Sequence, residues 1–119
     1  MIKYNATITA IGPLVQEFLN EGIIVLFGQQ APEELAEFAI LHDGTTLHAP
    51  LAAGDIVTMG DAPYTVLAVG EVASDNLRNL GHLVLKCNGQ HEVEMPGDVC
   101  VEAKPLPRLE VGMGLQVSG

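Results

Sequence analysis

The sequence Ile2-Lys3-Tyr4-Asn5-Ala6-Thr7-Ile8-Thr9-Ala10-Ile11 alternates apolar and polar side chains almost without a break until Gly12. Successive side chains of a β-strand point to opposite faces, so this period of two is typical of a strand with one buried and one solvated face. Residues 2–11 are therefore predicted to form a half-buried strand, and the rest of the chain must supply the sheet that it joins.

The next apolar runs along the chain predict further strands. Ile23 to Phe27 is bounded by Gly22 and Gly28, a pattern that favours a strand buried on both faces. Phe38 to His42 is predicted as another strand, and the Asp43-Gly44 pair after it is a strong signal for a hairpin turn.

Beyond Gly54 the apolar runs are short and closely spaced. The strands predicted there are Asp55–Met59, Tyr64–Val69, His82–Cys87, Gln90–Met95, Asp98–Ala103 and Gly114–Val117. Asn88-Gly89 lies between two of them and predicts a second hairpin turn.

Helical patterns are short and few. One or two turns are expected after Pro13 and after Pro32. A further turn is expected with Ser74 or Asp75 as its N-cap and Gly81 as its terminator. Many short strands with Gly and Pro turns and little helix predict a mostly-β fold, a closed barrel or a sandwich.

Length and charge limit the classes of function. The 119 residues, 48% of them apolar, fit one domain spanning residues 1–119. Five Lys and Arg against 15 Asp and Glu give a net charge of -10, which argues against nucleic acid and anionic membranes as partners. The longest apolar run is far shorter than the roughly 20 residues of a membrane span, and no secretory signal is present, so we expect a cytoplasmic protein without membrane insertion.

The two cysteines are expected to remain unpaired. Strand alternation places Cys87 on the core face and Cys100 on the solvent face, which argues against a disulfide between them. Two thiols without a second pair also cannot form a structural zinc site, and we expect no metal and no cofactor.

No Gly-rich phosphate loop, nucleophile elbow or dinucleotide motif is present, so the candidates for chemistry are the histidines, His42, His48, His82 and His91. His42 follows an apolar run directly before Asp43-Gly44. We expect its ring to be held by a packed strand and yet to lie at the surface, where one nitrogen can attack an electrophile while the other is fixed by a hydrogen bond. An ordinary surface histidine is the alternative interpretation of this position.

His82 begins a predicted strand after Gly81 and is the second candidate. It could donate a hydrogen bond to a phosphoryl group on a neighbouring imidazole, or it could simply bond to a carbonyl of the next strand. His48 and His91 are expected to face solvent. A metal site built on His42 and His48, six residues apart, is a weaker hypothesis because the spacing lacks a supporting carboxylate pattern.

Four blocks of this sequence resemble one family over nearly the whole chain. They are Thr7–Gly12, Ala31–His42, Val69–His82 and Pro96–Val99, of which Val69–His82 is the most specific. The chain resembles the glucitol/sorbitol-specific IIA component of the bacterial phosphoenolpyruvate-dependent sugar phosphotransferase system.

The resemblance implies a small closed β-barrel and a phosphotransferase component with a phosphohistidine intermediate. It implies that HPr phosphorylates His42, that the phosphoryl group passes to the IIB domain of the IIB/IIC hexitol permease, and that His82 can assist. The alternatives are a barrel that binds a sugar alcohol without a covalent intermediate and, third, a metal-dependent barrel enzyme. A homodimer stays open, because the strand Ile2 to Ile11 could pair across two chains as well as within one.

Overall fold

The computed structural model describes residues 1–119 as eight strands and three short helices. In chain order these are β1 (Ile2–Ile11), α1 (Val15–Leu19), β2 (Ile23–Gly28), α2 (Glu33–Ala36), β3 (Ile40–His42), β4 (Ile56–Met59), β5 (Ala62–Val69), α3 (Ala73–Leu80), β6 (Leu83–Lys86), β7 (Asp98–Val101) and β8 (Gly114–Ser118). None of the helices has the length and apolar character that crossing a membrane would require.

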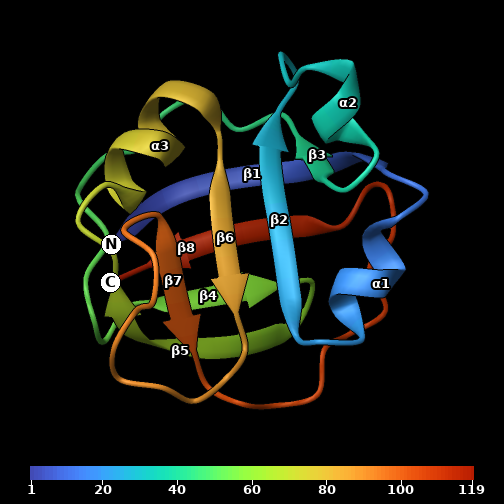
Figure 1. The fold of residues 1–119 in the computed structure, drawn as a ribbon. Helices are drawn as coiled ribbons and strands as arrows, with labels where there is room; N and C mark the ends of the chain where they lie inside the picture. The colour runs from blue at the N-terminus through green and yellow to red at the C-terminus, as the bar shows by residue number, and fades with distance from the viewer.

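The strands close into one barrel in the order β1-β3-β2-β6-β7-β5-β4-β8 (Figure 1). The predicted mostly-β fold and closed barrel are confirmed. Residues 2–7 of β1 pair with β8 and residues 8–11 pair with β3, so the structure uses this long strand inside one barrel. The core is aliphatic, as the composition indicates, and Tyr64 is its largest fully buried side chain.

Both predicted hairpin turns are wrong, because β3 does not pair with β4, the next strand in the chain, and the next strand after β6 is its parallel partner β7. β3 pairs with β1 and β2, which both precede it in the chain, whereas β7 follows β6 and runs parallel to it. A parallel partner cannot be reached through a two-residue turn. Residues 43–55 therefore form a long connection after β3, and residues 87–97 cross between β6 and β7 without the strand predicted at Gln90–Met95.

The crossover also overturns the predicted position of Cys100. All four residues of β7 are buried: Val99 and Val101 belong to the core, while the crossover contacts the other face, where the Cys100 thiol donates to the Glu92 carbonyl and the Met95 N–H donates to Asp98. Cys100 therefore lies in the interior, and both cysteines are free thiols. β2 shows the opposite error, because its Ile23 and Val25 are only half-buried while Ile24 and Leu26 face the core.

The helix predicted before Gly81 is confirmed, but its predicted N-cap is wrong. α3 ends at Gly81, whose φ of 66° lies in the left-handed region that favours glycine. At the other end no side chain caps the helix. Ser74 instead accepts a hydrogen bond from the Leu51 N–H (3.0 Å), which ties the helix to the long connection after β3.

An ion pair attaches this connection to β1, and its loss should destabilise the barrel. Lys3 Nζ lies 2.9 Å from both Asp55 oxygens, and the side chains are only 12% and 6% exposed. Asp55→Ala leaves the largely buried ammonium group of Lys3 without its partner. We therefore expect the free energy of unfolding, measured in urea, to fall by about 3 kcal/mol. Glu110→Ala, which removes the partner of an exposed Arg108, is the control and should cost less than about 0.5 kcal/mol. Equal losses would contradict the prediction.

Candidate functional site

His42 is the last residue of β3, and its ring is buried rather than at the surface. Its side chain is 1% exposed, so the predicted surface position is wrong. The predicted strand ending at His42 is right, but alternation along β3 turns the side chains of Ile40 and His42 inward and leaves Leu41 half-buried. The imidazole therefore belongs to the inner layer of the barrel, beside Tyr4 and Leu26.

Two backbone groups hold the His42 ring. Nε2 lies 2.7 Å from the Gly81 carbonyl oxygen, and the Gly44 N–H donates to Nδ1 at 3.1 Å. A carbonyl can only accept and an N–H can only donate, so the ring is a neutral imidazole with its proton on Nε2. Burial lowers the pKa of His42 below 6.5, although the bond to Gly81 and the charge of Asp43 act in the opposite direction.

Glycines allow the backbone to come this close. A Cβ on Gly81 would lie 2.7 Å from the Gly28 nitrogen and 3.0 Å from His42 Cε1. A Cβ on Gly44 would collide with the ring of Tyr4, which packs edge-on against His42 with 5.7 Å between the ring centres. Glycine is therefore required on both sides of the imidazole.

A polar cavity of about 330 Å³ adjoins these glycines. It lies between the end of β2, the segment after β3 and the last turn of α3, which gather at one end of the barrel (Figure 1). Gly28, Gly44 and Gly81 are part of its wall, and the polar side chains that line it are Gln29, Gln30, Asp43, Thr45, Arg78 and Asn79. Amide, hydroxyl and guanidinium donors of this kind can bind the oxygens of an anion.

His82 is held by different contacts and, like the His42 ring, is not among the groups that line this cavity. Its Nδ1 lies 3.1 Å from the Leu26 carbonyl oxygen, and its ring stacks on Phe27 with 4.1 Å between centres. A bond from His82 to a carbonyl of a neighbouring strand was one of the two interpretations of this position in the sequence analysis. The two histidines are linked through one peptide unit, because the Gly81 carbonyl binds His42 while the His82 N–H donates to the Asn76 carbonyl (3.2 Å).

The other two histidines lie outside the site. His48 and His91 are exposed, as predicted. No group of three or more His, Cys, Asp or Glu side chains is arranged so that it could hold a metal ion.

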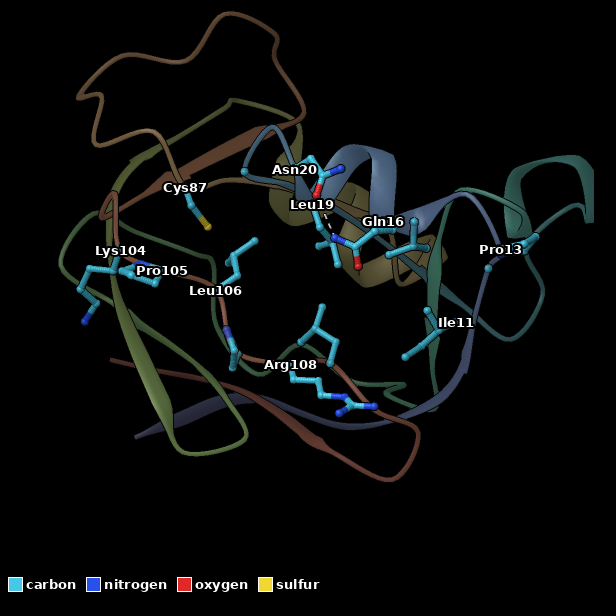
Figure 2. A pocket seen from close by; sticks show the side chains of 15 residues that line it. Ile11, Pro13, Gln16, Leu19, Asn20, Cys87, Lys104, Pro105, Leu106 and Arg108 are labelled. Carbon is cyan, nitrogen blue, oxygen red and sulfur yellow. Dashed lines mark hydrogen bonds between the residues drawn. The ribbon is translucent and has the colours of Figure 1, made fainter.

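A larger cleft of about 870 Å³ lies at the opposite ends of β2 and β6, between α1 and residues 104–109 (Figure 2). Gly22 and Cys87 belong to its wall, and Lys104 and Arg108 are its cations. Burial raises the pKa of Cys87 to about 11, which keeps the thiol protonated and unreactive near neutral pH. The cleft thus lacks a nucleophile, and the cavity beside His42 is the candidate site.

Comparison with known proteins gives the family. The model of the family described as "PTS system glucitol/sorbitol-specific IIA component" matches residues 3–116. The chain belongs to this family. It is therefore a component of a phosphotransferase system, as the resemblance predicted.

Individual relatives agree with the family. The chain is 40% identical over 106 residues to the glucitol/sorbitol-specific EIIA components of Shigella flexneri and Escherichia coli strain K12, which covers 89% of this chain and 85% of each relative. The crystal structure of a PTS system IIA component from Enterococcus faecalis V583 superimposes with a TM-score of 0.83 at 26% identity, covering 97% of this chain and 99% of the other.

Sequence reasoning did not identify Gly44, Gly81 and Tyr4 as parts of the site. Gly81 was predicted only as a helix terminator, and Gly44 only as a turn residue. Their contacts with His42 depend on which strands are neighbours, since the Gly81 carbonyl reaches Nε2 across 39 positions of sequence. A glycine after a helix, followed by a histidine, was the one local signal.

The neutral state of His42 should make stability depend on pH. Because its folded pKa lies below the 6.5 of an unfolded histidine, the unfolded chain binds more protons as the pH falls below about 6.5. We expect the unfolding free energy of the parent minus that of His42→Gln to be constant above this pH and to fall below it. Urea titrations between pH 7.5 and 5 measure the difference, and a flat difference would contradict the assignment.

The two buried tyrosines should respond differently to removal of their hydroxyls. The Tyr4 hydroxyl is buried without a hydrogen-bond partner, whereas the Tyr64 hydroxyl donates to the Pro105 carbonyl at 2.6 Å. Tyr4→Phe should therefore leave the stability of the unphosphorylated protein unchanged or raised, while Tyr64→Phe should lower it by about 1 kcal/mol. Thermal or urea unfolding of the matched pair tests this, and an equal loss in both variants would show that Tyr4 has an unrecognised partner.

Proposed function

We propose that this protein is the phosphoryl carrier of a hexitol (glucitol/sorbitol) uptake system. It receives a phosphoryl group from HPr on His42 and passes it to a cysteine on the IIB domain of the permease. The observation that carries this proposal is a neutral imidazole whose two nitrogens are held by Gly44 and Gly81, two residues that form part of the wall of a polar cavity. Membership of the family supports the same function.

The chemistry requires a neutral His42. One imidazole nitrogen attacks phosphorus as the N–P bond of the donor histidine breaks, and one proton moves from the His42 ring to the donor ring. Lowering of the His42 pKa by burial favours the neutral imidazole, in which one nitrogen has a free lone pair, near pH 7. Alignment and charge stabilisation are the remaining requirements of phosphoryl transfer.

The closed site has to open before transfer. Both nitrogens are engaged, with Gly81 and Gly44, and the side chain is almost inaccessible. Whichever nitrogen accepts the phosphoryl group, its backbone partner must first move away. The segment after β3 and the turn at Gly81 border the cavity, so docking of a donor protein there can couple partner binding to exposure of the ring.

His82 takes the auxiliary role in this proposal. Its bond to the Leu26 carbonyl puts the ring proton on Nδ1 and leaves Nε2 with a free lone pair. His82 can therefore donate to a phosphoryl oxygen only when it carries a second proton.

Labelling with phosphoenolpyruvate, enzyme I and HPr tests the assignment. Since His42 is buried, Gln is a better replacement than Ala, because it fills more of the space and retains polar groups. His42→Gln should lose all label, whereas the matched variant His82→Gln should keep it and accept it more slowly. The label on the parent should be stable to base and labile to acid, as expected of phosphohistidine.

Three outcomes would contradict the proposal. Label retained in folded His42→Gln would move the acceptor to His82. If the parent protein takes no label, the carrier function is wrong, and the alternative of a barrel that binds a sugar alcohol without a covalent intermediate is favoured. Equilibrium dialysis with sorbitol would detect such binding. If both His82→Gln and His82→Ala accept the phosphoryl group from HPr at the rate of the parent protein, His82 has only a structural role.

A further inference from the structure

We propose that Arg78 binds the phosphoryl group carried by His42 and stabilises its charge during transfer. This inference rests on the carrier function proposed above and assigns a role to a residue outside the histidines. Arg78 lies in the last turn of α3 and lines the cavity that also reaches Gly44 and Gly81.

The position of Arg78 follows from the helix that ends beside His42. Residues three apart on a helix share a face, and Gly81, three positions after Arg78, supplies the carbonyl that holds Nε2. The end of α3, residues 78–81, thus carries Arg78 and also supplies the carbonyl that orients the His42 imidazole. The cavity thus has Arg78 on one wall and, on another, Gly44 and Gly81, the two residues that hold the imidazole.

Charge makes a cation necessary at this place. Among the residues that line the cavity, Arg78 is the one cation and Asp43 the one carboxylate. A phosphoryl group adds about two negative charges to a chain that already carries -10. Without Arg78 the group would face a negative cavity in a negative protein.

The other four cations are committed elsewhere. Lys3 and Lys86 are held in ion pairs with the buried Asp55 and Asp98, at 2.9 and 2.8 Å. Lys104 and Arg108 border the cleft at the opposite ends of β2 and β6. Arg78 is therefore the cation of this chain that is placed to meet a phosphoryl group on His42.

The present partner of Arg78 can be exchanged at little cost. Arg78 pairs with Asp75 at 2.8 Å, but the two side chains are 45% and 67% exposed, and such pairs contribute little to stability. A guanidinium matches a phosphoryl group through two parallel hydrogen bonds, which are stronger than those of an exposed ion pair. The arginine can thus leave Asp75 when the phosphoryl group arrives.

The contribution of Arg78 to the reaction is electrostatic. As the N–P bond of the donor breaks and the bond to His42 forms, negative charge is spread over the three outer oxygens of the phosphoryl group. Arg78 donates hydrogen bonds to these oxygens and keeps its own proton. Its contact also lowers the free energy of the phosphorylated product.

The test is a single-turnover transfer from phosphorylated HPr, followed over a range of donor concentrations. Arg78→Gln should lower the rate at saturating donor roughly tenfold to a hundredfold, the size expected for one charged hydrogen bond. Arg78→Lys should recover part of the rate, because it restores the charge without the two-pronged geometry. Circular dichroism and the urea midpoint should match the parent.

Two variants serve as controls. Arg108→Gln makes the same change of charge at the far cleft and should transfer at the parent rate. Asp75→Asn breaks the ion pair but leaves Arg78 in place, so it should transfer at the parent rate or faster.

Three results would overturn the role of Arg78 and leave the carrier function intact. The first is that Arg78→Gln transfers at the parent rate when donor is saturating. The second is that Asp75→Asn loses as much rate as Arg78→Gln. The third is that Arg78→Gln changes only the donor concentration at half-saturation, which would make Arg78 a docking residue. Failure of the carrier function looks different, because the parent itself would then take no label on His42.

Discussion

The hydrogen bond between His42 Nε2 and the Gly81 carbonyl is the contact on which the organisation of this site depends. It joins the end of β3 to the end of α3, two elements that no short loop connects. It fixes the tautomer of the ring, and it exists only because Gly81 adopts a left-handed conformation that brings the peptide within 2.7 Å. The tautomer and the orientation of the His42 ring both depend on it.

The barrel topology explains why this contact forms at one end of the molecule. β3 lies between β1 and β2, and β2 is followed around the barrel by β6. Because β2 and β3 are parallel, both finish at the same end, and because β6 is antiparallel to β2, it begins there. Gly81, two residues before β6, thus meets His42, which ends β3, and the last turn of α3 places Arg78 at the same end of the barrel.

Local patterns predicted most elements of the fold, because alternation over β1, β4, β5, β6 and β8 depends only on which face is buried. Local patterns failed where the structure depends on which strands pair with one another. Asp43-Gly44 and Asn88-Gly89 have the composition of hairpin turns, but Asp43-Gly44 begins a long connection to β4, which does not pair with β3, and Asn88-Gly89 lies in the crossover to the parallel strand β7. Cys100 contacts the crossover segment between β6 and β7, which forms no strand. The alternation of side chains along β7 alone could not predict that contact.

The site shows the same division. The family resemblance and the end of an apolar run both singled out His42, yet neither indicated that the ring is covered on every side. That property comes from Tyr4, Gly44 and Gly81, which approach from three separate parts of the chain. Polar residues around the cavity, including Arg78, lie in a helix and loops whose composition is that of ordinary solvated surface.

Closure of the barrel also determines how other proteins can be recognised. Every strand has a neighbour on both sides, so a visiting protein cannot extend the sheet by adding a strand of its own. Recognition has to use side chains and loops at the rim, contacts that form and separate without rearranging a backbone ladder. A relay protein that must leave one partner before meeting the next gains rapid turnover of complexes from such a surface.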